Sequence, residues 1–175
     1  MEAARVLSMS VAEYLEFEEK SDVRHEYIGG EIHAMSGVSK AHNTITGNIF
    51  AALRTRLRGG PCQVFIADFK VRLEVAREEI FYYPDVVVTC NTASIEQYFL
   101  RLPTLVVEVL SPSTETIDRR EKKMNYLQSQ SLGEYVLVAQ DRREVTIFRR
   151  DTGWQGETFS APESQIELRS IKQRI

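Results

Sequence analysis

The chain has little cysteine and histidine and no long apolar run. It contains two cysteines and three histidines. Cys62 and Cys90 lie far apart and outside any metal-ligand spacing, so a zinc site is not expected. We expect two buried free thiols in a reducing cytoplasm. No stretch is long enough to cross a bilayer, and acidic residues occupy the N-terminal segment where a secretory signal would carry its apolar core. The sequence therefore predicts a cytoplasmic protein with no membrane partner.

Positive charge is also scarce, although it is typical of proteins that bind nucleic acids. The formal net charge is -3 and the pI is about 5.7, whereas affinity for phosphates normally comes from surplus lysine and arginine. Basic residues cluster in two places: Arg54, Arg56 and Arg58, and Arg119, Arg120, Lys122 and Lys123. Either cluster alone is equally well explained as the solvated face of a helix.

Several sequence motifs for phosphate or acyl chemistry are missing. Gly29-Gly30 and Gly59-Gly60 lack the spacing of a phosphate-binding or dinucleotide-binding loop. Ser111-Pro112-Ser113-Thr114 is not part of a Gly-x-Ser-x-Gly turn, so a serine nucleophile is not indicated. We interpret this segment as a turn that caps a helix.

The hydrophobic pattern alternates between helical and strand periods. Helices are predicted over 10–19, 39–58, 93–100 and 115–130, and strands over 27–35 (two short pieces), 62–75, 81–89, 104–110, 134–139 and 145–148, with weak edge strands or a tail after Gly153. In the last helix, Ile117, Met124 and Leu127 group as the apolar face. This order predicts an α/β fold: a mixed central sheet with a helix on each face, in a single domain spanning 1–175 with its core at about 10–150.

Two carboxylates interrupt strongly apolar strands. Asp85 precedes Val86-Val87-Val88, and Glu108 lies inside the run from Leu105 to Leu110. A buried charge must be paired or bound to metal, so each could form an ion pair with a lysine or arginine. If the two strands are adjacent, a divalent cation between the carboxylates is an equally good explanation. Mg²⁺ suits this arrangement because one or two carboxylates, water and a substrate phosphate satisfy it.

At this point the sequence resembles a known family. The motifs that carry the resemblance are His25-Glu26-Tyr27-Ile28-Gly29-Gly30-Glu31-Ile32, Met35-Ser36-Gly37, His42-Asn43, Tyr83-Pro84-Asp85, Val106-Val107-Glu108-Val109-Leu110-Ser111-Pro112-Ser113-Thr114, Asp118, Lys122, Tyr126 and Glu134-Tyr135. In order they are similar to the PD-(D/E)xK nuclease superfamily and, within it, to a bacterial restriction-endonuclease-like (Uma-type) family. The resemblance implies a restriction-endonuclease-like core, here with extra N-terminal and C-terminal strands.

One position departs from the superfamily signature. The usual lysine lies two residues after the strand glutamate, where this chain has Leu110. The related family places the lysine on the following helix, which matches Lys122, with the adjacent Lys123 as its rival. Asp118, Lys122 and Tyr126 form one helical stripe. The alternative for Asp118 and Lys122 is an exposed i,i+4 ion pair.

The resemblance implies a Mg²⁺-dependent (or Mn²⁺-dependent) endonuclease that hydrolyses phosphodiester bonds in DNA. Asp85, Glu108 and a backbone carbonyl of Val109 or Leu110 would hold the metal, and Lys122 would orient the attacking water or stabilise the phosphoryl charge. Glu26 resembles an additional metal ligand acting through water; its alternative is a surface carboxylate beside Arg24.

Other residues have weaker assignments. His42 matches a family position that could contact phosphate, or it caps a helix. Arg119 and Lys123 are candidate contacts to nucleic acid. Asp68 interrupts an apolar strand and could support the site, although a structural role fits it equally well. His25 and His33 lack a pattern for metal binding.

Two further functions stay open. The chain could be a catalytically silent module that binds nucleic acid or protein on a nuclease fold, which Leu110 and the acidic pI favour. It could also hydrolyse a smaller phosphate ester. A homodimer that cuts both strands is a further expectation, with the segment after Glu134 as its contact.

Overall fold

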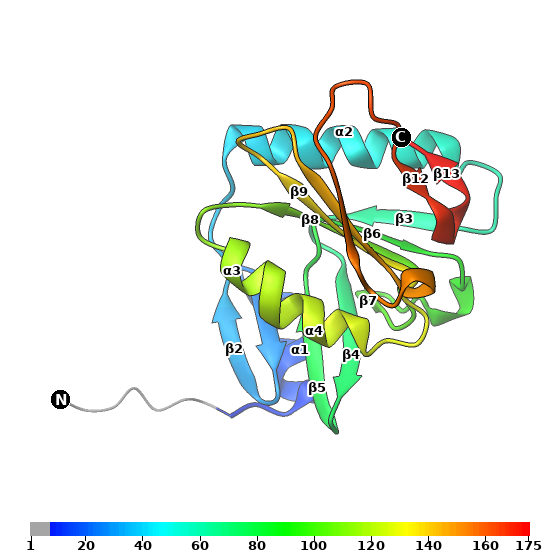
Figure 1. The fold of residues 1–175 in the computed structure, drawn as a ribbon. Coiled ribbons are helices and arrows are strands. Elements are labelled where there is room, and N and C mark those ends of the chain that lie inside the picture. The colour runs from blue at the N-terminus through cyan, green and yellow to red at the C-terminus, as the bar shows by residue number, and fades with distance from the viewer. Residues whose placement is uncertain (1–7) are drawn as a thin grey trace.

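The computed structural model describes residues 8–175, whose main feature is a six-stranded sheet (Figure 1). The strand order is β11 (Gly156–Phe159), β10 (Val145–Arg149), β9 (Glu134–Ala139), β8 (Leu105–Leu110), β6 (Val86–Thr89) and β3 (Gln63–Ile66). Strands β8 and β9 run parallel, and the other neighbours run antiparallel. The predicted mixed sheet is therefore confirmed.

A second sheet of five strands lies beside the first. Its order is β2 (Glu31–Ala34), β1 (His25–Ile28), β5 (Glu78–Tyr82), β4 (Lys70–Val75) and β7 (Phe99–Leu100), and a separate pair joins β12 (Glu167–Leu168) to β13 (Gln173–Arg174). The β1–β2 hairpin turns at Gly29 and Gly30, whose φ angles of 56° and 107° favour glycine. The predicted N-terminal and C-terminal extra strands are present.

Helices lie on both faces of the six-stranded sheet, as the sequence predicts. The helices are α1 (Val11–Lys20), α2 (Lys40–Arg56), and a continuous helical segment made of α3 (Glu115–Ile117), a π-helical turn (Asp118–Lys122) and α4 (Lys123–Leu127). Ser10 and Glu13 form a capping box at α1, and Ser39 caps α2 by accepting the His42 N–H at 3.1 Å. Helix α2 covers one face of the sheet, and the segment α3–α4 lies on the other (Figure 1).

Both central strands are buried along their whole length. Every residue of β6 and β8 is buried. Alternate residues point to opposite faces: Val86, Val88 and Leu105 pack with Leu53 beneath α2, whereas Val87 and Val106 pack with the α4 face. The apolar run 104–110 was therefore correctly interpreted as a central strand, as was the second half of the run 81–89.

Two predicted strands are wrong because each is divided between the two sheets. The run 62–75 contains β3 and β4, separated at Ala67 with φ 53°, and the run 81–89 contains the end of β5 and the whole of β6, separated at Pro84-Asp85. The two crossings are neighbours, since the Ala67 N–H donates to the Asp85 carbonyl at 3.1 Å. In 62–75 the apolar positions shift from Val64 and Ile66 to Phe69, Val71 and Leu73, and this change of phase marks the crossing that the single predicted strand overlooked. The run 81–89 is apolar at almost every position, so it has no alternation that could reveal a break.

The two later helix predictions also need correction. Residues 93–100 form a 3-10 turn (Thr92–Ser94) followed by strand β7. In the segment 115–130, Ile117 and Met124 are 46% and 64% exposed, whereas Asp118, Lys122 and Tyr126 are buried. The polar stripe faces the protein interior because it completes a charged cluster, and this places part of the predicted apolar face in solvent.

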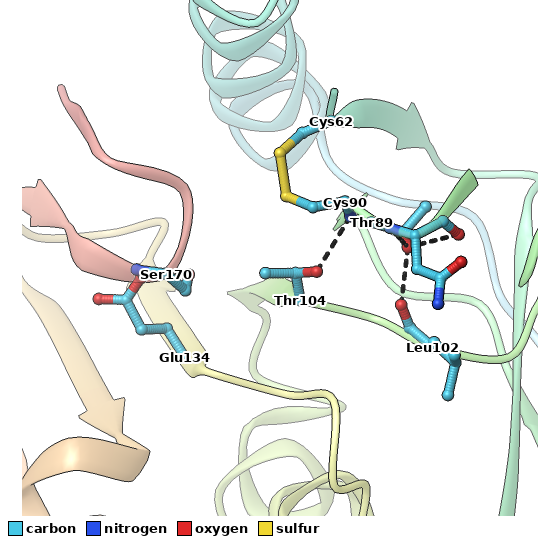
Figure 2. The surroundings of a disulfide bond; sticks show 8 residues. Cys62, Thr89, Cys90, Leu102, Thr104, Glu134 and Ser170 are labelled. Atoms are coloured by element: carbon cyan, nitrogen blue, oxygen red, sulfur yellow. Dashed lines mark hydrogen bonds between the residues drawn. A yellow bond between two sulfur atoms is a disulfide. The ribbon is translucent and has the colours of Figure 1, made fainter. Parts of the chain in front are cut away.

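Cys62 and Cys90 are not free thiols, contrary to the sequence-based expectation. Their sulfur atoms form a disulfide (Figure 2). The β3–β6 register pairs Gln63 with Thr89, so the next residues outward lie opposite each other, with their Cα atoms 3.9 Å apart. The Cys90 N–H also donates to Thr104 Oγ1 at 3.1 Å. The two cysteines are 28 residues apart in the sequence and meet only because β3 pairs with β6, so the spacing alone did not predict the disulfide.

Glu134, part of the family-like Glu134-Tyr135 motif, holds the C-terminal segment. It is 1% exposed and accepts a hydrogen bond from Arg149 Nε at 3.0 Å. It also accepts one from Ser170 Oγ at 2.6 Å, and Figure 2 shows these two residues side by side. This motif residue is thus structural. Within residues 8–175, no helix combines the length and apolarity that a membrane span needs.

Candidate active site

The pairing of β6 with β8 brings the two strand carboxylates together. The register pairs Val86 with Val107, so Asp85 and Glu108 occupy the next position along the two strands. The Asp85 N–H donates to Glu108 Oε2 at 3.3 Å, and the Val109 N–H donates to Asp85 Oδ2 at 2.7 Å. The strands are adjacent, as the metal hypothesis requires.

Lys122 reaches the same cluster from the π-helical turn. Its Nζ lies 2.8 Å from Glu26 Oε1, 3.6 Å from Asp118 Oδ1 and 3.8 Å from Glu108 Oε1. The Lys122 side chain is 8% exposed, and that of Glu26 is 13% exposed. The exposed i,i+4 pair is therefore wrong for Asp118 and Lys122. Glu26 is likewise not a surface carboxylate beside Arg24.

His42, on the first turn of α2, completes the cluster from the opposite side. Its Nε2 lies 3.2 Å from Asp85 Oδ2, and the residue is 5% exposed. Ser39 provides the side-chain cap of α2, so His42 is not the cap that the sequence allowed. Asp85 Oδ2 is held by both His42 and the Val109 N–H, which fixes the orientation of this carboxylate.

A pocket of about 430 Å³ opens over these residues. Its walls come from the segment between β2 and α2, from the turn Ser111–Thr114, and from the charged cluster. Figure 1 shows the β2–α2 connection running along the side of the molecule on which α3 begins. The pocket thus lies at the end of β8, where the two sheets meet.

Negative charge dominates this pocket. Its lining includes Glu26, Asp85, Glu108 and Asp118, with Lys122 as the only lysine or arginine among the described lining residues. Burial raises the pKa of Glu108 well above its ordinary value; Lys122 opposes this shift, and the neighbouring carboxylates add to it.

The carboxylates favour the charged forms of Lys122 and His42 by raising the pKa of each side chain. Burial alone would lower the pKa of Lys122, but Glu108, Glu26 and Asp118 together raise it above its usual value. The hydrogen bond to Asp85 raises the pKa of His42, against the effect of burial, and the Val109 carbonyl adds to the rise. The cluster of carboxylates therefore stabilises positive charge on both Lys122 and His42.

The donor set fits a divalent cation held by few protein ligands. Within residues 8–175, no three His, Cys, Asp or Glu side chains converge as a ready-made metal site. Glu108 Oε1 and Asp118 Oδ1 are nevertheless buried oxygens without a hydrogen bond among the described residues. Mg²⁺ suits such a place, because it binds one or two carboxylates and keeps several waters.

Comparison with known proteins identifies the family. The Uma2 family, described as "Putative restriction endonuclease", matches residues 11–174.

The chain belongs to the Uma2 family.

Relatives of this Uma2 chain occur in Synechocystis sp. The uncharacterized protein slr1290 is 36% identical over 166 residues, which cover 93% of this chain and 86% of the relative. The uncharacterized protein sll1609 is 30% identical over 177 residues, covering 98% and 99% of the two chains.

The fold also matches a solved structure. A crystal structure from Anabaena variabilis ATCC 29413, described as a "putative nuclease", aligns with a TM-score of 0.76 and 16% identity, covering 94% of this chain and 91% of the other. The family resemblance and the nuclease-like fold expected from the motifs are thus confirmed, and together they support a nuclease.

Several residues with sequence-based assignments lie outside the Uma2 pocket. Arg119 forms ion pairs with Glu115 at 2.8 Å and Glu144 at 3.3 Å, and Lys123 Nζ lies 4.4 Å from the centroid of the Phe148 ring. Lys123 is therefore not placed to replace Lys122. The Asp68 side chain is 73% exposed and lies 3.5 Å from Arg24, so it does not support the site.

The sequence analysis missed a buried network behind the Tyr83-Pro84-Asp85 turn. Tyr83 Oη donates to Glu18 at 2.9 Å and accepts from Lys70 Nζ at 3.1 Å, while the Tyr83 N–H donates to Glu26 at 3.3 Å. Burial lowers the pKa of Lys70. The available signal was that Lys70 begins an alternating apolar strand, but Tyr83 connects it to Glu18 on a helix that is distant in the sequence.

Proposed function

We propose that this protein is a Mg²⁺-dependent endonuclease that hydrolyses phosphodiester bonds in DNA; Mn²⁺ is the alternative metal. The observation that supports this most strongly is the convergence of four carboxylates and one lysine in a single pocket. Such a pocket has excess negative charge, which repels phosphate until a cation is present. A Uma2 family match and a nuclease-like fold agree with this chemistry.

Asp85 and Glu108, with the Val109 carbonyl, would hold the metal. When bound, Mg²⁺ would supply Lewis-acid stabilisation of the charge on the phosphoryl oxygens. His42 and the Val109 N–H orient the Asp85 carboxylate through its Oδ2 atom. Glu26, paired with Lys122 at 2.8 Å, keeps that ammonium beside the metal-binding carboxylates.

Lys122 supplies the positive charge that Leu110, at the usual lysine position, lacks. Leu110 is 4% exposed and packs in the core, so no charged group projects from that strand position. Lys122 Nζ instead approaches Glu108 from the helix. There it orients the water that attacks phosphorus, or it stabilises the charge on the phosphoryl oxygens as the P–O bond to the leaving oxygen breaks.

The test is plasmid nicking by purified protein in Mg²⁺ or Mn²⁺, with the Mg²⁺-induced rise in melting temperature as a second readout. We expect Asp85→Asn to abolish both nicking and the thermal shift. Asp151→Asn is the matched control, since this exposed carboxylate lines neither this pocket nor its neighbour. Plasmid left equally intact by wild type and Asp85→Asn in both metals refutes the proposal and favours the silent binding module. Cleavage of a small phosphate ester alone would favour the third hypothesis.

A further inference from the structure

A second cavity, of about 390 Å³, adjoins the proposed metal pocket, and His42 and Asp85 line both. The two cavities share the segment 35–38, which forms a wall of each. The lining of the second cavity combines apolar side chains with charged ones, among them Asp22, Arg24 and Asp68, and with the polar Asn43 and Thr46 on the first turns of α2. A group bound there would be next to the residue that we propose as a metal ligand.

Two buried polar atoms at this cavity have no partner among the described residues. Thr46 Oγ1 and His42 Nδ1 make no hydrogen bond, although both residues are only 5% exposed. An unpaired buried polar group destabilises a fold. Asn43 is exposed beside them, and its carboxamide makes no hydrogen bond within residues 8–175. These groups could all bond to the polar edge of a ligand.

The rim of the same cavity exposes large apolar side chains. Val23, Met35 and Val38 are 46%, 37% and 57% exposed, and all three line the cavity. Apolar surface concentrated beside a polar site marks a binding surface. A phosphate gains nothing from such surface, whereas a nucleobase has apolar faces and a hydrogen-bonding edge. The basic residue at the cavity, Arg24, is paired with Asp68.

We propose that this cavity binds an unpaired nucleobase next to the scissile phosphate, an inference that rests on the proposed nuclease function. The substrate would then be single-stranded DNA, or a loop or bubble in a duplex, because a stacked and paired base cannot enter a lateral pocket. Thr46 and Asn43 would contact the polar edge of the base, and Met35 and Val38 its faces.

Binding is measured with a fluorescent short single strand, the same backbone made abasic, and the matching duplex, all with Ca²⁺ in place of Mg²⁺. We expect the intact single strand to bind at least tenfold more tightly than the abasic strand, and more tightly than the duplex. Thr46→Val and Asn43→Ala should each weaken that binding by about tenfold, which corresponds to one lost hydrogen bond. Thr55→Val and Asn48→Ala, on the exposed side of the same helix, are the controls.

A second readout separates ligand binding from a structural role. Thr46→Val removes a buried hydroxyl that has no partner, so its melting temperature should equal or exceed that of wild type while its affinity falls. A lower melting temperature together with unchanged affinity would assign Thr46 to the fold and overturn its role in binding.

The outcomes also distinguish this inference from the proposed function. Equal affinity for intact and abasic strands overturns the base site even if the protein nicks plasmid. Base-dependent binding by a protein that leaves plasmid intact in Mg²⁺ and Mn²⁺ supports the base site and refutes hydrolysis. Failure to bind any strand overturns the base site, and the plasmid assay then decides hydrolysis separately.

Discussion

Replacing Lys122 by methionine should destabilise the metal-free protein far more than its place on a surface helix suggests. The ammonium lies within 4 Å of three carboxylates, at 2.8, 3.6 and 3.8 Å, and its side chain is 8% exposed. Removing one partner of a buried ion pair leaves an uncompensated charge and costs about 3–5 kcal/mol. For a chain of this size, the melting temperature should fall by about 10 °C at neutral pH.

The pH dependence of that loss follows from the carboxyl groups. Burial raises the pKa of Glu108 and of Asp118, and Lys122 opposes both shifts. A carboxyl with a raised folded pKa stabilises the fold below its unfolded pKa of about 4, and this contribution is lost as pH rises through the folded pKa. Without Lys122, the pKa of each of these two carboxyls is raised further. The stability of the variant should therefore fall more steeply with increasing pH, and the two proteins should converge in acid.

Urea denaturation from acidic to neutral pH, in EDTA, measures this difference. Lys123→Met is the matched control and should cost less than about 1 kcal/mol, because it removes only a cation–π contact with Phe148. The double variant Lys122→Met/Glu108→Gln should recover part of the lost free energy of unfolding, since it removes one of the uncompensated buried charges. If Lys122→Met and Lys123→Met cost the same, or their difference does not vary with pH, the account of a shared buried ammonium is refuted.

Two further predictions concern the disulfide and His42. Cys62→Ser/Cys90→Ser should lower the free energy of unfolding by about 3.5 kcal/mol, the chain-entropy value for a separation of 28 residues, as measured by urea denaturation. Dithiothreitol should destabilise wild type but not the double variant, and equal sensitivity would contradict a closed disulfide. In metal-free protein, NMR should find the pKa of His42 above 6.5 and lower in Asp85→Asn. His42 then stabilises the fold below about pH 6.5, and this contribution is lost as pH rises through its raised pKa; titration of wild-type His42 at or below 6.5 would contradict this.

The sequence predicts where the helices and strands lie better than it predicts which strands pair. Helices α1 and α2 and strands β8 and β9 lie where the apolar periods place them. The predictions for 62–75 and 81–89 are wrong because each run changes sheet, at Ala67 and at Pro84-Asp85. The first change appears in the sequence only as a shift in the phase of the alternation, and the second lies within an almost continuous apolar run. The prediction of two free thiols is wrong for a related reason, since Cys62 and Cys90 meet only through the β3–β6 register.

For the site, apolar context locates the strand carboxylates but not their surroundings. Asp85 and Glu108 stand out because charges are rare in such strands. The burial of Lys122 contradicts the helical pattern, because Ile117 and Met124 are exposed on the opposite side. Family resemblance, rather than periodicity, identified this lysine. The contacts of Tyr83 with Glu18 and Lys70 link three elements, and no spacing along the chain indicates them.

The positions of the carboxylates on different sheets have a mechanical consequence. Glu26 belongs to the five-stranded sheet, Glu108 to the six-stranded sheet, and Asp85 to the chain that crosses between them. An ion held by Asp85 and Glu108 would join the six-stranded sheet to the segment that crosses to the five-stranded sheet, where Glu26 holds Lys122. Movement between the two sheets would separate the metal-binding atoms before either sheet unfolds. The affinity for the ion would therefore depend on how the two sheets pack against each other.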